Sequence, residues 1–564
     1  MSAIQETRIE DHFNNWPNVQ GFDANYEEKT PIELPVEGQI PAYAAGVLYR
    51  TGPGKYKVDT VNGETFHASH WFDGFSETHR FQLLAPDSTH PSMRVLYNSR
   101  FSTDALIEQV RQTGEMHKLS FGQKRDPCKV VYQKVQTEYE PEEKPTSTAA
   151  NIGVTLSINM PGLADNSTNN HRWDTSSGIK TLHAKTDFNA FKQLDPETLE
   201  PMTLASQQNL HPDLKGPSTA AHARSDPKTG DIFNYNLEFG PVNTYRIFRT
   251  SASTGETTIL ATFPATPAYL HSLLITADYV VLCVWNAHIS PADFGSNSAS
   301  FLDTIKPFDP SLPATWYVVD RTGERGLIAT YTSRPFFCFH TINAWQETTQ
   351  NGDTDIVAEL VTFDTTDFMH KLYYEYLLSD SPHAKPRTDE TYSSVSRFRL
   401  PAIPSPSSSS SSAPNPEPQN PQEALLESTS CKPFSPELPT MHPAYVTRKH
   451  RYMYAVADTG KSTLFDSIIK FDNESGETKV WSHHAQSPGE PIFVPNPDGV
   501  EGDGDEDDGV LLSVVLDGLT GKSYLLCLDA RSLVELGRAR VAGPVAFGFH
   551  GQYVPVRGLP TGDY

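Results

Sequence analysis

The sequence predicts an all-β protein, and a β-propeller covered by a cap fits it best. Three observations lead to this fold class. From about residue 150 onward, the chain consists of short apolar runs separated by turn signals. No long helical pattern interrupts these runs, apart from a short candidate helix at residues 364–378. The chain has 564 residues, which is enough for one large ring of strands.

The N-terminal part begins with a polar segment, residues 1–37, that we expect to be an extended lead-in. Two strand-rich segments with Gly, Pro and Asp turns follow at residues 46–56 and 67–84. The next segment, residues 101–122, is predicted to form a partly amphipathic helix whose apolar side carries Leu106, Ile107 and Val110. We favour packing of this apolar side on the core, with contact with a membrane as the alternative.

The β-rich part of the chain repeats one local pattern. Two turns have the same form, DPKTGD at residues 226–231 and NESGET at residues 473–478. Many short strands without interleaved helices fit a propeller, a sandwich or a barrel, and the chain length favours a propeller. The repeat is too degenerate for the blades to be counted from spacing. The expected strands include IKTLHAKTDF, DIFNYNLEF, YRIFRT, YVVLCVW, ATWYVVD, DIVAELVTF, YMYAVAD and SIIKFDN.

Two polar segments interrupt the strands. Residues 401–427 are rich in Ser and Pro and predict a disordered insertion loop. Strand-like sequence of the same kind continues after this loop, so we expect one domain over residues 1–564. Residues 498–508 are acidic and are interpreted as a solvated turn, with a carboxylate-rich calcium site as the alternative.

The overall composition narrows the function. A net charge of -24 argues against nucleic acid as a partner. The five cysteines form no CxxC pair, which argues against a disulfide framework and a thiolate zinc site. The N-terminus resembles no secretory signal, and the most apolar stretch, residues 273–285, is too short to span a bilayer. We therefore expect a cytoplasmic protein, with peripheral attachment to a membrane or lipid droplet as an alternative, and infer no protein partner.

Four of the twenty histidines stand out because small or apolar residues flank them. Any one alone is best interpreted as a hydrogen-bonded core histidine. Four together favour a metal site, because neutral imidazole is the commonest metal ligand and a ring of strands can bring them to one axis. Zinc, copper and iron all accept imidazole, and six-coordinate iron would keep two positions for oxygen and substrate. These histidines are His222, His271, His340 and His550.

Two glutamates are candidates for the carboxylates that usually accept the second N–H of a ligand histidine. Glu437 lies in SPELP and Glu490 lies in GEPIFVP. Both lie next to a proline in apolar sequence, outside any run of charges. An exposed surface glutamate is the alternative for each.

Motifs along most of the chain resemble the carotenoid cleavage oxygenase family. The N-terminal signatures are RTGPGKY and HWFDGF. The histidine segments are DPETLEP with STAAHARSDPKTGD, then YLHSLLIT, FCFHTINAWQE and FGFHG. The most specific motif is EPIFVP together with EDDGVLLSVVLD.

The resemblance implies a seven-bladed β-propeller with a loop and helix cap and one Fe(II) on its axis. The four histidines named above would hold the iron. Glu437 would orient His340, and Glu490 would orient His550. Asp187, in HAKTDFNAF, is the choice for the third carboxylate.

The reaction implied by the resemblance is cleavage of one conjugated C=C bond by O₂, giving two carbonyl products. An apolar tunnel would select the bond that reaches the iron. An apolar polyene comes from a lipid phase, so we expect a modest apolar patch at the tunnel mouth. Leu106, Ile107 and Val110 are the candidates for this patch.

The favoured substrate is a carotenoid such as β-carotene or torulene, giving retinal or an apocarotenal. A stilbene such as resveratrol or an apocarotenoid is the alternative. Lys185 could bind a stilbene phenol, but the segment NIGVTLSINMPG offers Leu156 and no tyrosine beside it. A metal-free binding propeller, or an isomerase or hydrolase that uses the iron as a Lewis acid, are the remaining alternatives.

Overall fold

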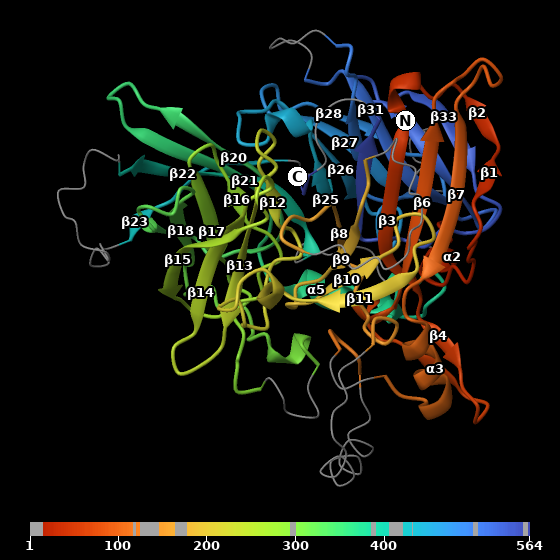
Figure 1. Cartoon of the computed structure of the whole chain (residues 1–564), viewed down its shortest axis with the longest axis horizontal. Coiled ribbons are helices and arrows are strands. Elements are labelled where there is room, and N and C mark those ends of the chain that lie inside the picture. The colour runs from red at the N-terminus through yellow and green to blue at the C-terminus, as the bar shows by residue number, and fades with distance from the viewer. Residues whose placement is uncertain are drawn as a thin grey trace, which may run out of the picture.

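The computed structural model of the chain is built mainly from antiparallel strands (Figure 1). It describes residues 15–116, 120–124, 146–163, 178–293, 300–384, 391–404, 421–430, 433–499, 506–556 and 562–563. Within these residues, seven sheets of four to six strands form the blades of a β-propeller. The expected all-β class and the seven blades are therefore confirmed. A separate two-stranded ribbon pairs β4 (Lys57–Asp59) with β5 (Thr65–His67).

Most blades are built from a run of consecutive strands, and the first and last blades also take strands from the opposite end of the chain. In spatial order, the seven sheets contain β1 (Ile32–Leu34), β7 (Arg94–Phe101), β6 (Phe75–Leu84), β3 (Gly46–Lys55) and β34 (His550–Pro555); β11 (Pro201–Ala205), β10 (Phe191–Leu194), β9 (Leu182–Lys185) and β8 (Thr155–Ile158); β12 (Arg224–Ser225), β13 (Ile232–Glu238), β14 (Thr244–Thr250) and β15 (Thr257–Pro264); β16 (Leu274–Ile275), β17 (Tyr279–Val284), β18 (Ala314–Asp320), β19 (Leu327–Ser333) and β23 (Gln422–Glu423); β20 (Phe337–Thr348), β21 (Thr354–Phe363), β22 (Ser393–Ile403) and β24 (Leu425–Ser430); β25 (Ser435–Thr440), β26 (Tyr452–Asp458), β27 (Ser467–Asp472) and β28 (Thr478–Trp481); and β2 (Val36–Gly38), β33 (Glu535–Arg540), β32 (Lys522–Asp529), β31 (Gly509–Asp517) and β29 (Gln486–Pro488), with β30 (Ile492–Pro495) also paired to β31.

The two ends of the chain close the ring. The last strand, β34, pairs with β3, and Thr51 lies opposite His550 in this register. Figure 1 shows the red N-terminal strands beside the blue C-terminal ones. The predicted lead-in takes part as well, because β1 pairs with β7 and β2 pairs with β33. The described part of the lead-in is therefore more than an extended segment, because it supplies an edge strand to each of two blades.

The recurring turns have a common cause. In each, an aspartate side chain accepts backbone N–H groups of the turn: Asp226 from Lys228 and Asp472 from Glu474. Each turn then passes through a glycine with positive φ, +76° at Gly230 and +75° at Gly476. The sequence form DxxxG(D/E) therefore encodes the connection between neighbouring strands.

Short helices lie outside the blades. The helix predicted at residues 101–122 is α3 (Asp104–Thr113), and the candidate at residues 364–378 is α5 (Asp367–Lys371) with α6 (Tyr374–Leu377). A fourth helix, α2 (Val19–Phe22), packs near the N-terminus. The apolar side of α3 is buried in a small cluster with Val58, Phe75 and Phe101. Its residues Leu106, Ile107 and Val110 therefore do not form an exposed patch, which corrects their assignment to a tunnel mouth.

The segment predicted to be disordered, residues 401–427, is bounded by ordered strands. Its first residues end β22, and its last residues form β23 and part of β24. The remainder, residues 405–420, lies outside the described residues. In the acidic loop, Glu506 accepts the backbone N–H groups of Arg451 and Tyr452, so this carboxylate caps a strand start. Within the part of the chain that the structure describes, no helix has the length and apolar character needed to cross a bilayer.

Candidate metal centre

The four predicted histidines occupy equivalent places in four blades. Each lies in, or two to three residues before, the edge strand β12, β16, β20 or β34 of its sheet. His222 and His271 are also joined through the backbone, because the N–H of His222 donates to the carbonyl of His271 at 3.1 Å. The propeller thus delivers one imidazole from each of four edges to the same point.

The imidazole nitrogens converge closely. One nitrogen from each of the four rings lies within 4.8 Å of the others. The Nε2 atom of His550 is 2.9 Å from Nε2 of His222 and 3.3 Å from Nε2 of His340. Two nitrogens bound at right angles to one ion, each about 2.1 Å from it, would be about 3.0 Å apart. The spacing therefore fits a shared metal ion.

Three of the rings are held by carboxylates on the far side. The Nδ1–H of His271 donates to Asp187 Oδ2 at 2.8 Å, and that of His550 donates to Glu490 Oε1 at 2.7 Å. His340 makes the equivalent bond to Glu437 through a very short contact. The structure thus places each of the three predicted carboxylates against a different histidine, including Asp187.

These contacts fix the tautomers and create a need for a cation. Because Nδ1 of His340 and His550 each donates its proton to a carboxylate, both Nε2 atoms present lone pairs. Those lone pairs face each other across 3.3 Å with no proton between them. A positive ion between the rings removes this repulsion, so these two donors fit a shared metal ion and not a hydrogen bond between His340 and His550.

Burial keeps the imidazoles of His222 and His550 neutral. It lowers the pKa of His550 to about 4, against the opposing effect of Glu490. Burial and the neighbouring imidazoles push the pKa of His222 well below its ordinary value. For Glu490, burial raises the pKa, but the contacts with His550, Arg50 and Gly551 outweigh it and hold the pKa below the ordinary value. His222 and His550 are therefore neutral donors, and His550 lies beside an ionised carboxylate.

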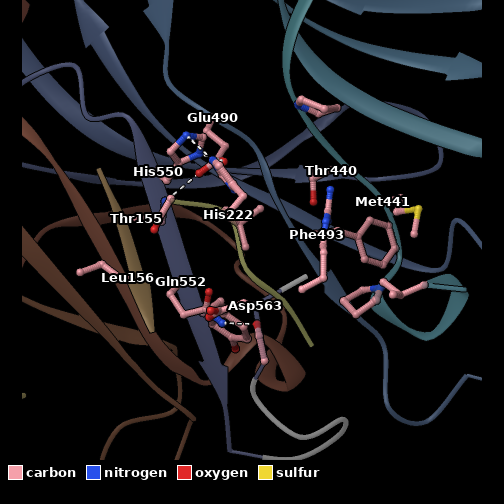
Figure 2. Close-up of a pocket in the computed structure, with 18 of the residues that line it drawn as sticks. Thr155, Leu156, His222, Thr440, Met441, Glu490, Phe493, His550, Gln552 and Asp563 are labelled. Atoms are coloured by element: carbon pink, nitrogen blue, oxygen red, sulfur yellow. Dashed lines mark hydrogen bonds and ion pairs between the residues drawn. The ribbon is translucent and has the colours of Figure 1, made fainter. Parts of the chain in front are cut away.

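Two cavities reach the histidines. The aromatic cavity touches His271, His340 and His550 and is otherwise mostly apolar, with Trp71, Phe72, Val154, Phe339, Phe368, Leu372, Leu438, Phe465 and Phe549 in its wall. The second cavity, which we call the polar cavity because the charged residues Lys185, Arg224, Glu490 and Asp563 lie within its otherwise largely apolar lining, touches His222 and His550. Figure 2 shows His222, His550 and Glu490 grouped at one end of the polar cavity, and Gln552 and Asp563 at the other.

Lys185 and Leu156, the candidate substrate contacts, both line the polar cavity. Lys185 is buried and forms an ion pair with Asp563. Asp563 also accepts a hydrogen bond from Ser157 at 2.7 Å. Neither Lys185 nor Leu156 belongs to the lining of the aromatic cavity.

Two residues that support the site were not identified in the sequence analysis. Tyr269 donates its hydroxyl to Asp187 Oδ2 at 2.9 Å, and Arg50 forms an ion pair with Glu490 at 2.6 Å. Tyr269 could have been found, since residues two apart in an extended segment lie on one side and Tyr269 precedes His271 by two. Arg50 is 440 positions from Glu490, so no local pattern joins them.

Comparison with known proteins gives the class. Residues 21–555 match the family model described as retinal pigment epithelial membrane protein. A Neurospora crassa protein named carotenoid dioxygenase is 39% identical, over 98% of this chain and 93% of its own length. A Gibberella fujikuroi protein named torulene dioxygenase is 36% identical, over 98% of this chain and 96% of its own length. The chain therefore belongs to this family of carotenoid oxygenases.

Solved structures agree on the fold. A variant of the Synechocystis apocarotenoid oxygenase superposes with a TM-score of 0.71 at 21% identity, over 95% of this chain and 98% of that one. A cobalt-substituted form of the same oxygenase gives a TM-score of 0.71 at 21% identity. That form covers 96% of this chain and 98% of its own. Both confirm the propeller.

Proposed function

We propose that this chain is a non-haem Fe(II) dioxygenase that cleaves one conjugated C=C bond of a carotenoid, β-carotene or torulene, with O₂. The products are two aldehydes, such as retinal or an apocarotenal. The convergence of four imidazole nitrogens, three of them oriented by carboxylates, carries this proposal. The names of the fungal relatives, carotenoid dioxygenase and torulene dioxygenase, support the substrate class.

His222, His271, His340 and His550 would hold the iron. Iron would supply the activation of O₂, which no side chain of the chain can perform alone. The three carboxylates keep the Nδ1 proton on their histidines, so each Nε2 lone pair stays directed at the ion. A cobalt-substituted form is known for the Synechocystis oxygenase, which supports exchangeable divalent metal binding on this fold.

The aromatic cavity would hold the polyene. Aromatic rings line this cavity, and their edges and faces can pack against a conjugated chain. Two of these rings, Phe549 and Trp71, contact each other with their centres 4.8 Å apart. Apolar walls also exclude water from the reacting bond, and the depth of the cavity sets which bond lies beside the histidines. Lys185 pairs with Asp563 in the other cavity and is not among the residues that line the aromatic cavity, so it would not bind a phenol there.

A substrate of this kind dissolves in lipid rather than water. We therefore propose that the chain takes it from a membrane or lipid droplet through a transient surface contact. Co-flotation of the protein with carotenoid-loaded liposomes, and no flotation of the protein in liposome-free buffer, would support this step. Carotenoid transfer that proceeds equally well without any co-flotation would argue against it.

The test of the function is a paired assay on Fe(II)-loaded protein. One arm contains β-carotene or torulene in detergent micelles, and the other contains resveratrol in buffer. We expect polyene loss with retinal or an apocarotenal, identified by mass, and no hydroxybenzaldehydes from resveratrol. Products from resveratrol alone would reverse the choice of substrate, and activity on neither with iron bound would reject the proposal.

A further inference from the structure

Arg50 is a buried cation one layer behind the proposed metal ligands. It lies on β3, and its side chain is 3% exposed. Its Nη1 atom is 2.6 Å from Glu490 Oε2. Two glycines make room for the guanidinium: a Cβ added at Gly489 or Gly551 would lie 3.2 or 3.1 Å from one of its terminal nitrogens. This close glycine packing leaves the guanidinium one defined position.

Glu490 is the point on which Arg50 acts. One carboxylate oxygen, Oε1, accepts the Nδ1–H of His550 at 2.7 Å. The other, Oε2, accepts from Arg50 and from the backbone N–H of Gly551 at 2.7 Å. Rotation of the carboxylate would break all three contacts, so Arg50 and Gly551 together determine the direction from which Glu490 holds His550.

The other two carboxylates have different supports. Asp187 accepts from the hydroxyl of Tyr269 and the backbone N–H of Ala221, at 2.9 Å each. Glu437 accepts from the backbone N–H of Leu438. Among the described ion pairs, only Glu490 of the three meets an arginine or lysine. The His550 arm is thus supported by a permanent charge, and the His271 and His340 arms by neutral donors.

We infer that Arg50 is a positioning residue of the metal centre, which holds Glu490 in place so that His550 keeps its Nε2 directed at the ion. A charge-assisted hydrogen bond from the guanidinium is stronger than one from a neutral donor, so Arg50 holds the Glu490 carboxylate more firmly than a neutral donor would. This inference rests on the proposed metal site and adds to it a residue from the opposite end of the chain.

The test is Co(II) binding by the full-length chain, measured by titration and by the visible absorption of the bound ion. Arg50→Met should weaken Co(II) affinity by about 10- to 100-fold, the range for losing an outer partner of a ligand histidine. Arg50→Lys restores the charge and should recover part of this loss. In the Glu490→Gln background, Arg50→Met should change affinity less than about twofold, because the residue through which it acts is already altered.

A matched control is available in another blade. His450 lies 3.1 Å from Glu359, which also accepts from Arg397 at 2.7 Å, so the same three residue types are paired there. His450 is not a member of the four-histidine cluster. Arg397→Met should therefore lower the thermal midpoint without changing Co(II) affinity or the absorption spectrum.

The outcomes separate the inference from the proposed function. Wild-type protein that binds neither Co(II) nor Fe(II) overturns both. Wild-type protein that binds metal, with unchanged affinity in Arg50→Met, overturns only the role of Arg50. An equal loss in both the wild-type and Glu490→Gln backgrounds also overturns it, since Arg50 would then act independently of Glu490. If Arg50→Met does not fold, Arg50→Lys and its combination with Glu490→Gln complete the same comparison.

Discussion

Each imidazole of the centre is directed by the residue behind it. His271 is an example, because Asp187 accepts its Nδ1–H while Tyr269 and Ala221 hold Asp187. Removing the ring removes one donor and leaves the others in place. The metal affinity should therefore respond more strongly than the fold.

We predict that His271→Ala binds less than one tenth of the iron that the wild-type chain binds, because one of four ligands is lost. Metal content after gel filtration measures this directly. His450→Ala is the control, since it removes a buried, carboxylate-paired histidine that is not a member of the cluster. Full iron occupancy in His271→Ala would remove His271 from the site.

At this scale, the sequence could identify side chains whose setting was unusual. A histidine among glycines and phenylalanines, such as His550, has no local structural reason to be there. The same holds for Glu490 beside a proline in an apolar run. Arg50 was missed because its partner lies 440 positions away and only the closed ring brings them together.

At the scale of elements, amino-acid composition located the Ser/Pro-rich segment but not the residues at which the neighbouring strands end and begin. Its composition marked residues 401–427, yet β22 continues to Ile403 and β24 begins at Leu425. The amino-acid composition changes gradually at the ends of such a segment, whereas strand pairing ends at a definite residue. Val395 lies opposite Ser430, a pairing that is only visible once both strands are placed.

We predict that replacing residues 405–420 by a short Gly/Ser linker leaves the thermal midpoint and the metal content unchanged. Deleting residues 401–427 instead removes the end of β22 and half of β24, so it should lower the midpoint or the soluble yield. Comparing the two deletions by thermal unfolding checks this prediction. Equal stability would mean that β24 adds nothing to its blade.

At the scale of the whole molecule, the ring depends on its first blade, where β34 pairs with β3. Seven blades could not be counted from the sequence, because turn spacing varies and the first and last sheets mix both ends of the chain. The fold class could be predicted, since it depends on many short strands, the lack of long helical patterns between them and the length of the chain. The same blade also contains an ionisable group that couples the stability of the ring to pH.

Glu77 lies on β6 in this blade, and burial raises its pKa from 4.5 to about 8. Between these values the folded chain holds a proton that the unfolded chain has lost. The free energy of unfolding should therefore fall as the pH rises from about 5 to 8 and level off above that, by about 1.4 kcal/mol per pH unit at most. Glu77→Gln should flatten this part of the profile.

Thermal midpoints of the wild-type chain and Glu77→Gln across this pH range make the comparison, and the difference between them isolates Glu77 from other titrating groups. Identical slopes in the two proteins would show that Glu77 is ionised in the folded chain near neutral pH.

The most direct test of the central claim is cleavage under ¹⁸O₂. Fe(II)-loaded chain is given β-carotene or torulene in micelles, and the aldehydes are reduced at once so that their oxygen cannot exchange with water. We expect two products that each contain one ¹⁸O atom, and no products from chain loaded with redox-silent Zn(II). Unlabelled products, or an intact carotenoid despite bound iron, would contradict it.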